Sequence, residues 1–375
     1  IRMPNKSKEH KIMMKFKYLF ISRTLRGGGA ERFISTFTNY LADCGYEVHL
    51  LLYEKTEQDY YSSDKVKKTI LPNEPISLKG KLLRLVDVYK AISNINPDVI
   101  IPFVDTVVIS AFMANCILNK KFVYTVRVSP WHQKEVGSRF SNLMRTIIAD
   151  KADAIMLQTA EQGEFFPQSY KKREYVVPNP IPEKYREIEK TEYRDVFRKI
   201  VLTARLEKQK NIPLLISAFN EVIKGKNNEI ELYIYGEGTE KENIQTLINS
   251  LKLNNVCHLM GRSSDVETVL KNADMFIMTS DYEGMPNSLM EAMAIGVPCI
   301  SSKCKTGPKD LIDEGNTGIL FETGNKKELV NKMNWALEHT ELMNRMGRCA
   351  RKRINEMYTN SSSKKKFDQM IDAIM

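Results

Sequence analysis

The segment 279–293 contains the residues of this chain that are best suited to binding a hydroxyl-rich anion. Glu283 and Glu291 lie eight positions apart, so one is expected in a loop and the other about a turn inside the helix that follows. Carboxylates in those places can accept hydrogen bonds from hydroxyl groups at two ends of one ligand. Between them, Pro286 suits the first helical turn, where free amides bind anions or sugar oxygens. The residues predicted to line this loop are Gly284, Met285, Pro286, Asn287 and Ser288.

A purely structural role explains Glu283 less well. Acidic side chains near the start of a helix complement the helix dipole. Gly284 and Pro286, however, separate Glu283 from a simple cap. We therefore expect this carboxylate to face a ligand.

Arg205 and Lys210 form a second candidate pair, in a loop that follows the apolar run 200–203. A guanidinium can bind a diphosphate through two parallel hydrogen bonds, and an ammonium adds a compact positive charge. The alternative for such a pair is a solvated loop.

A third candidate is the glycine run 27–29, which follows the first predicted strand. Gly28 and Gly29 would let the backbone approach a ligand closely. The run is not Gly-x-Gly-x-x-Gly and no Gly-Lys-Ser/Thr follows, so neither a dinucleotide fingerprint nor a P-loop is predicted. A flexible turn is the alternative reading. Weaker candidates on the same expected rim are Gly261, Arg262 and the loop 305–310.

All these candidates follow short apolar runs, which alternate with amphipathic stretches such as 30–42 and 81–92. Continuous apolar runs suit strands that are buried on both faces of a parallel sheet. Ligands bind beyond the carboxyl ends of such strands, where helices begin. The predicted strands are 18–21, 48–53, 99–101, 122–124, 154–157, 200–203, 232–235, 256–259, 275–278, 298–300 and 318–321.

Two α/β domains are predicted, each with a doubly wound parallel sheet. Three prolines within 175–182 end the first series of strands, because proline donates no backbone hydrogen bond. The predicted parts are a first domain over 1–182, a linker over 183–199, a second domain over 200–355, and a C-terminal helical segment over 356–375 that can cross back onto the first domain.

The net charge of +10 resides in residues 1–200, whereas 201–375 sum to about zero. A basic half can face nucleic acid, anionic lipid or a phosphorylated substrate, or can simply favour solubility. No apolar stretch of about 18 residues is present, so no membrane span is predicted. Residues 1–17 lack the apolar core of a secretory signal. The six cysteines are scattered without metal-binding spacing, which favours reduced thiols over zinc or disulfides.

With these motifs in place, the sequence resembles the family-4 retaining glycosyltransferases of GT-B fold, from about residue 17 and most strongly over 199–323. The most specific matches are Glu283-x7-Glu291 and the pair Arg205 and Lys210 in an RLxxQKN loop. The segments 27–32 and 177–181 are similar to the family too. The resemblance implies an α/β GT-B architecture, with two Rossmann-like domains whose parallel sheets face each other across a cleft.

The resemblance also implies a role for each residue. Arg205 and Lys210 would hold the donor diphosphate and neutralise the departing nucleotide. Glu283 would contact the donor sugar, with the 284–288 backbone near sugar and phosphates, and Glu291 would accept hydrogen bonds from the ribose. Two further backbone segments would complete the donor site. The backbone near Gly261 and Arg262 would meet the base, and Gly28 and Gly29 would approach the phosphates.

Family members commonly need no metal, and this chain has no Asp-x-Asp motif to contradict that. We therefore expect no cofactor and no metal ion besides the nucleotide-sugar substrate.

The sequence departs from the family pattern after the fourth strand of the first domain. Many members carry a histidine there, near the acceptor, whereas this chain has Arg127 and Pro130, similar to an Arg-x-x-Pro variant in part of the family. Arg127 is therefore expected to contact the sugar or the acceptor. Further acceptor-side candidates are Asp105, Thr106 and His132.

In this fold the first domain takes the acceptor, expected to be a glycan or a polyprenyl-diphosphate-linked glycan. Its basic surface then predicts a cytoplasmic enzyme that binds peripherally to the anionic inner face of the membrane. The expected reaction transfers a hexose or N-acetylhexosamine, from a UDP-sugar, in bacterial surface polysaccharide synthesis such as capsule assembly.

The rival functions fall into two classes, another GT-B enzyme and a nucleic-acid-binding protein. A nucleotide-sugar epimerase would need a carboxylate and histidine set, and a phosphorylase would need a cofactor lysine, neither of which is found. A nucleic-acid-binding protein is suggested by the charge alone and lacks a recognition-helix signature, so no nucleic-acid partner is expected.

Overall fold

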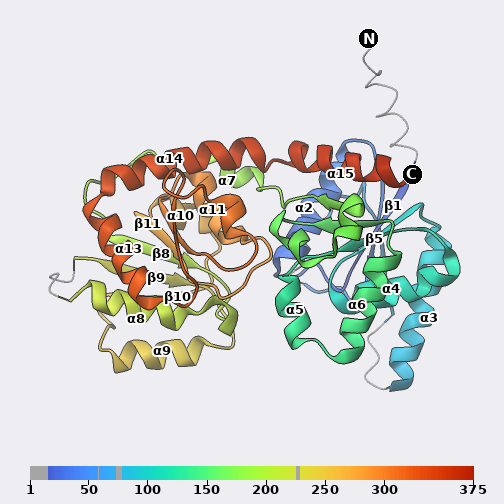
Figure 1. Cartoon of the computed structure of the whole chain (residues 1–375), viewed down its shortest axis with the longest axis horizontal. Helices are drawn as coiled ribbons and strands as arrows, with labels where there is room; N and C mark the ends of the chain where they lie inside the picture. The colour runs from blue at the N-terminus through green and yellow to red at the C-terminus, as the bar shows by residue number, and fades with distance from the viewer. Residues whose placement is uncertain (1–15, 58, 73–77, 225–228) are drawn as a thin grey trace, which may run out of the picture. The chain divides into compact units, whose positions relative to one another are not determined.

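The computed structural model describes residues 16–57, 59–72, 78–224 and 229–375. The expectation about a signal at 1–17 falls almost entirely outside these residues. The chain forms two compact units: unit 1 comprises Ile1–Pro180 with Asn360–Met375, and unit 2 comprises Ile181–Thr359. Each unit is a parallel sheet covered by helices, so the predicted α/β class with two doubly wound sheets is confirmed (Figure 1).

In unit 1, seven strands form a sheet in the order β3-β2-β1-β4-β5-β6-β7. Tyr18 of β1 lies opposite Val48 of β2 on one side and Val99 of β4 on the other. The strand order reverses between β1 and β4, and ligands bind at the carboxyl ends of strands at such a point. The strands are β1 (Lys17–Ser22), β2 (Glu47–Leu52), β3 (Lys67–Ile70), β4 (Val99–Pro102), β5 (Lys121–Thr125), β6 (Ala154–Leu157) and β7 (Glu174–Val176).

Alternate residues of β1 pack into two cores, one on each face of the unit 1 sheet. Tyr18 and Phe20 pack with the helices α2 and α15, whereas Leu19 and Ile21 pack with α3, α4 and α6. The apolar runs of unit 1 are therefore strands buried on both faces of the sheet, as the sequence predicted. The helices of unit 1 are α2 (Gly29–Asp43), α3 (Leu78–Ile95), α4 (Asp105–Leu118), α5 (Pro130–Val136), α6 (Arg139–Lys151) and α15 (Asn360–Ile374).

In unit 2, six parallel strands follow the order β10-β9-β8-β11-β12-β13, with the reversal between β8 and β11. Ile200 of β8 lies opposite Met275 of β11. The strands are β8 (Lys199–Thr203), β9 (Glu231–Tyr235), β10 (Cys257–Gly261), β11 (Met275–Met278), β12 (Cys299–Ser302) and β13 (Ile319–Phe321). The helices are α7 (Glu183–Glu187), α8 (Ile212–Val222), α9 (Lys241–Ser250), α10 (Val266–Lys271), α11 (Asn287–Ile295), α12 (Pro308–Leu311), α13 (Lys326–Glu338) and α14 (Thr340–Met357).

The segment 183–199, predicted as a linker, belongs to unit 2. Tyr185 and Phe197 are buried in the core of that unit, and the amide of Lys190 donates to the carbonyl of Ile295. The high charge of this segment suggested a solvated linker, but its few aromatic residues anchor it. The division between the units falls instead between 180 and 181.

Helix α15 belongs to unit 1, although it lies at the end of the chain. Phe367 is fully buried, and its ring lies 5.7 Å from that of Tyr18 and 5.4 Å from that of Phe37. Within the described residues, no helix is long and apolar enough to cross a membrane.

Replacing Phe367 by alanine should cost about 3–5 kcal/mol of unfolding free energy, because the cavity is closed off by the sheet and α2. Urea denaturation of the full chain measures the loss. Lys365→Ala, at an exposed position of the same helix, is the control and should change stability by less than about 0.5 kcal/mol. Equal effects of the two substitutions would show that α15 is not part of the unit 1 core.

Candidate active site

The predicted donor-binding residues of unit 2 come together at the carboxyl ends of β8 and β11. Arg205 and Lys210 lie between β8 and α8, and Glu283 lies between β11 and α11. Because β8 and β11 are neighbours at the reversal of strand order, these two loops are adjacent.

The ammonium of Lys210 donates to Oε1 of Glu283 at 2.5 Å. The side chains are only 12% and 8% exposed. Gln209 donates through Nε2 to Oε2 of Glu283 at 3.4 Å and to the carbonyl of Tyr282 at 2.7 Å. Both oxygens of the carboxylate are therefore held by the β8–α8 loop.

Further hydrogen bonds fix these two loops to each other. Thr279 donates to the carbonyls of Lys210 and Asn211, at 3.0 and 3.1 Å. Asn211 donates to Asp281 at 2.8 Å, and its left-handed backbone (φ 43°) turns the chain into α8. The ammonium of Lys210 is thus placed by a defined turn. Gln209 and Asn211 lie in the RLxxQKN motif, but the sequence predicted no role for them.

Helix α11 begins at Asn287, so the prediction that Pro286 lies in the first helical turn was wrong. Pro286 has an extended backbone at the N-cap position, and its carbonyl accepts from the amide of Met290 at 3.1 Å. The backbone amides of Asn287 and Ser288 still lie in the first turn of α11, at the positive end of the helix dipole. Glu291 lies one turn inside, as predicted, and is 4% exposed.

The loop between β12 and α12 supports the loop that carries Glu283. The hydroxyl of Thr306 donates to the carbonyl of Glu283. Gly307 has φ +96°, and a β-carbon there would lie 2.5 Å from Cδ of Pro286 and 2.8 Å from the carbonyl oxygen of Gly284. The close approach of the two loops therefore requires glycine at 307. In the sequence, only the weak turn signal Thr-Gly-Pro indicates this loop.

The loop that carries Arg205 packs against the turn after β9, for which the sequence predicted no role. A β-carbon on Gly236 would lie 1.7 Å from the carbonyl oxygen of Ala204, and one on Gly238 would lie 2.3 Å from that of Leu206. The signal that could have found this turn is the Gly-Glu-Gly sequence directly after β9. Arg205 itself is exposed at the surface of unit 2.

Gly261 and Arg262 lie at the same end of the sheet, beyond β10. Gly261 has φ +70°, and its carbonyl accepts from the amide of Gly236 at 2.8 Å. Arg262 is exposed. Beside the central pair, burial and then the charge of Glu283 raise the pKa of Tyr282, so its phenol stays protonated at neutral pH.

In unit 1, the glycine run leads into α2. Gly27 has φ +71°, and Gly28 occupies the N-cap position of α2. A β-carbon on Gly28 would lie 1.9 Å from Oε2 of Glu31, so the carboxylate folds back over the glycine. At the start of α2, Gly29 is therefore exposed, whereas Gly28 is half-buried beneath this carboxylate.

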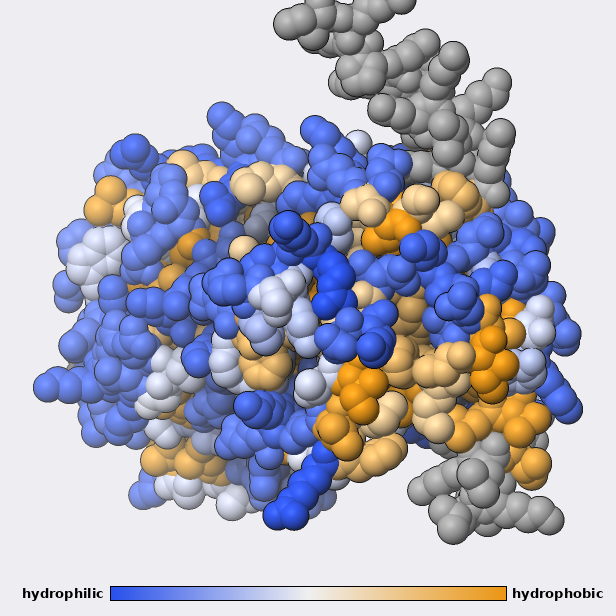
Figure 2. Space-filling model, turned by 45° about the vertical axis from the view of Figure 1, so that its right-hand side comes forward, coloured by the Kyte–Doolittle hydropathy of each residue, from blue (hydrophilic) through white to orange (hydrophobic). Residues whose placement is uncertain are grey.

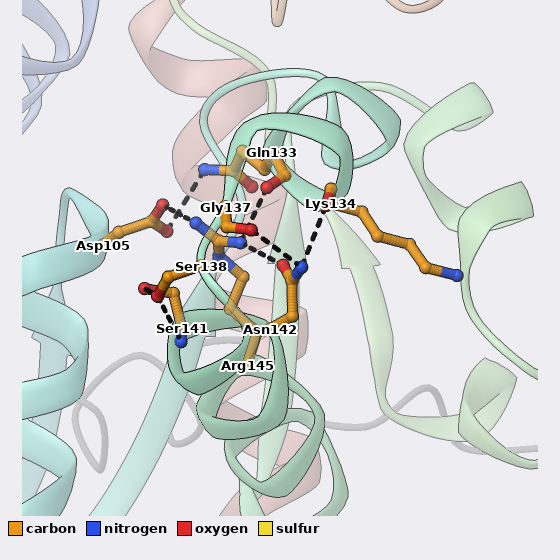
Figure 3. A network of polar contacts seen from close by, with 8 residues as sticks. All are labelled: Asp105, Gln133, Lys134, Gly137, Ser138, Ser141, Asn142 and Arg145. Atoms are coloured by element: carbon orange, nitrogen blue, oxygen red, sulfur yellow. Dashed lines mark hydrogen bonds and ion pairs between the residues drawn. The ribbon is translucent and has the colours of Figure 1, made fainter.

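The acceptor-side candidate Asp105 is held in a network of unit 1 (Figure 3). One carboxylate oxygen pairs with Arg145 of α6 at 2.5 Å, and the other accepts from Gln133 of α5 at 3.2 Å. Arg145 also donates to Asn142 at 2.7 Å. Asp105 thus joins the helices α4, α5 and α6, and a role at the acceptor stays a prediction.

The other acceptor-side candidates lie at the same end of the unit 1 sheet. Thr106 is exposed in the first turn of α4, and His132 is half-buried in α5. Arg127 follows β5 and is 9% exposed, with its guanidinium stacked on the rings of Phe33 and Phe103. Within the described part of the chain, no group of three or more His, Cys, Asp or Glu side chains could hold a metal ion.

Two known protein families match this chain, and both consist of glycosyltransferases. Residues 27–185 match the model for glycosyltransferase family 4, and residues 184–353 match the model for glycosyl transferases group 1. This chain belongs to the family-4 glycosyltransferases. The resemblance drawn from the sequence motifs is confirmed, and the protein is a glycosyltransferase.

The relatives of this glycosyltransferase are moderately similar. An uncharacterized glycosyltransferase of Methanocaldococcus jannaschii is 31% identical over 65% of this chain and 66% of its own length, which is just under two thirds. A Campylobacter jejuni alpha-1,4-N-acetyl-D-galactosaminyltransferase, whose name specifies a GalNAc- and diNAcBac-containing PP-undecaprenol, is 24% identical over 91% of this chain and 94% of its own length.

Solved structures show the same fold. HepE of Anabaena, determined with UDP and glucose, has a TM-score of 0.77 at 18% identity, with 95% of this chain and 99% of that chain covered. Sucrose-phosphate synthase of Thermosynechococcus elongatus has a TM-score of 0.80 at 15% identity, covering 96% of this chain and 98% of that chain. The predicted GT-B fold is therefore confirmed.

Replacing Gly307 by alanine should lower the unfolding free energy by about 1–3 kcal/mol more than backbone strain alone, because the new methyl group would push the 284–286 loop away from its place. Gly315→Ala is the matched control. Gly315 also has a left-handed backbone (φ +77°), but no atom lies within 4 Å of its added β-carbon. Urea denaturation of the two variants measures the difference. Equal losses of stability would show that backbone strain, rather than displacement of the loop, is responsible.

Proposed function

We propose that this glycosyltransferase moves a hexose or N-acetylhexosamine from a UDP-sugar to a glycan or polyprenyl-diphosphate-linked acceptor, in the synthesis of a bacterial surface polysaccharide. The observation that carries the proposal is the Lys210–Glu283 pair between the β8 and β11 loops, beside the start of α11. Unit 2 would bind the donor and unit 1 the acceptor.

The chemistry of a nucleotide-sugar donor matches the residues gathered in unit 2. As the bond between the anomeric carbon and the diphosphate breaks, negative charge grows on the departing diphosphate. Arg205, the ammonium of Lys210 and the amides at the start of α11 supply fixed positive potential for that charge. Glu283 and Glu291 supply acceptors for the hydroxyl groups of the sugar and the ribose.

The outcome at the anomeric carbon is retention in this proposal, and no metal ion takes part. Retention rests on the Glu283-x7-Glu291 motif of the family resemblance. The cations of unit 2 would stabilise the leaving diphosphate in place of a divalent metal. The acceptor hydroxyl bonds to the anomeric carbon on the same face from which the diphosphate departs, and its proton passes to the departing diphosphate oxygen.

The names of related proteins support the donor and the acceptor. HepE was determined with UDP and glucose, and the Campylobacter jejuni relative is named for a PP-undecaprenol-linked glycan. A diphosphate-linked lipid acceptor would place this enzyme at an anionic membrane surface, on the cytoplasmic side where nucleotide sugars are made.

Replacing Glu283 by glutamine should lower kcat about 10²–10³-fold, since the uncharged amide keeps the shape but loses the charge that orients Lys210. Transfer from UDP-[14C]sugars to lipid-linked acceptors, assayed with EDTA present, measures the loss. The matched control is Glu221→Gln. Glu221 pairs with Lys326 at the same 2.5 Å distance on the exposed surface of unit 2 and should not affect turnover. Normal turnover in Glu283→Gln would remove Glu283 from the active site.

A membrane-facing surface is supported by side chains on one face of unit 1. The apolar patch consists of Val136, Phe140, Leu143, Ile147, Met113 and Ile117, which are 38–73% exposed. Phe140, Leu143 and Ile147 lie at helical spacing on the outer side of α6, and α4 packs beside α6. Figure 2 shows apolar surface gathered on its right-hand side, where Figure 1 draws α3 to α6.

Charge and anchoring both suit this patch to an anionic bilayer. Exposed Lys134 and Arg139 flank it, with Glu135 as the one nearby exposed acid of α5. Arg145, on the other side of α6, pairs with Asp105 and donates to the carbonyl of Gln133 (Figure 3). The apolar side chains of α6 that belong to the patch are exposed. A helix with this division inserts its apolar face among lipid headgroups.

Replacing Leu143 by glutamate should weaken binding to vesicles of phosphatidylcholine with phosphatidylglycerol about tenfold, because a buried charge replaces an inserted apolar group. Co-sedimentation at low and high salt measures it. Leu342→Glu, at a comparably exposed leucine of unit 2, is the control and should bind like the unchanged protein. Equal binding by all three proteins would exclude the apolar patch as the membrane contact.

A further inference from the structure

Arg127 is a buried cation for which the described chain offers no counter-charge. Its side chain is 9% exposed, and no Asp or Glu of the described residues forms an ion pair with it. Its partners are uncharged: Nη1 donates to Oδ1 of Asn179 at 3.3 Å, and Nη2 lies 3.9 Å from the sulfur of Met156. Its Nε is buried without a hydrogen-bond partner.

The energetic situation of this guanidinium is unfavourable. Oδ1 of Asn179 is shared with Gln158, which donates to it at 3.0 Å. Burial lowers the pKa of Arg127 to about 9, and no acidic group of the described chain raises it again. The rings of Phe33 and Phe103, 4.0 and 4.7 Å away, replace only part of the lost hydration. A buried charge that is left uncompensated normally destabilises a fold.

The surroundings of Arg127 point to the missing partner. Arg127, Phe103, Gln158 and Asn179 all follow the carboxyl ends of strands in the unit 1 sheet. Helices α2 and α4 begin beside them, so the helix dipoles add positive potential rather than balance the charge.

Backbone strain marks the same end of the sheet. Val104, which follows Phe103 and precedes α4, has φ +72°, a conformation that β-branched residues rarely adopt. Such strain persists where surrounding structure enforces it, and it gathers at ligand sites.

We infer that Arg127 binds an anionic group, a phosphate or a carboxylate, of the acceptor substrate. The inference rests on the proposed function, because unit 2 already has Arg205 and Lys210 for the donor diphosphate. A separate cation in unit 1 is then available to a second anion, which the acceptor must carry. Arg127 would thereby select acceptors that bear a phosphate or an acidic sugar over neutral ones.

The test measures binding and stability on the full chain, with methionine as a substitute of similar shape. UDP is first added to saturation to occupy the donor site. Inorganic pyrophosphate and glucuronate are then titrated by calorimetry into the wild-type protein, Arg127→Met, Arg127→Lys and Arg205→Met. Melting temperatures are recorded without any ligand.

The inference predicts that Arg127→Met melts no lower than the wild type, since an uncompensated charge has been removed. Its affinity for at least one of the two anions should fall about tenfold to a hundredfold, as expected for a lost charge-assisted contact. Its affinity for UDP should be unchanged. Arg127→Lys should retain part of the anion binding, and Arg205→Met should lose UDP affinity while keeping the anion response of unit 1.

Three results would overturn the inference. A melting temperature many degrees lower with unchanged anion binding, in Arg127→Met and Arg127→Lys alike, would make Arg127 a structural residue. Loss of UDP affinity in Arg127→Met would assign Arg127 to the donor. No anion binding by the wild type would leave the guanidinium without a ligand. Failure of the wild type to bind UDP would instead contradict the proposed function, and the anion titration would then be read without UDP.

Discussion

The ion pair between Lys210 and Glu283 is the interaction on which the proposed donor site of unit 2 depends. It joins the loop after β8 to the loop after β11, the two strands between which the sheet reverses its order. Both partners are nearly buried, so removing one alone would leave an uncompensated charge and cost about 3–5 kcal/mol. The pair therefore fixes the position of both loops, and with them the start of α11. A donor diphosphate that meets Lys210 would compete with Glu283 for its ammonium, which couples donor binding to the position of the carboxylate.

Close backbone packing keeps these loops in place where side chains could not fit. Gly307 holds the β12–α12 loop against Gly284 and Pro286, and Gly236 and Gly238 hold the β9–α9 turn against the loop of Arg205. These contacts fix the backbone of the two loops that carry Lys210 and Glu283. Backbone groups do not change rotamer, so the positions of these loops are set before a ligand binds. Such preorganisation is what electrostatic stabilisation of a leaving group requires.

Much of the fold was predictable, because the strands are apolar runs buried on both faces. Strand β3 was missed, since its Lys-Lys-Thr-Ile sequence lies at the exposed edge of the sheet. The prediction of a linker over 183–199 was wrong, because the burial of Tyr185 and Phe197 in the core holds this charged segment in unit 2. The site could be assembled because Glu283, Lys210 and their spacing belong to a recognisable motif. The burial of Arg127 and the ion pair of Asp105 were not predictable, because they depend on residues such as Asn179 and Arg145 that are distant in sequence.

The most direct test of the central claim is a crystal structure of the full chain with UDP bound. The account predicts that the diphosphate lies within hydrogen-bonding distance of Arg205 and Lys210 at the start of α11, with the ribose hydroxyls donating to Glu291. A diphosphate bound elsewhere, with the Lys210–Glu283 pair remote from the nucleotide, would contradict the account.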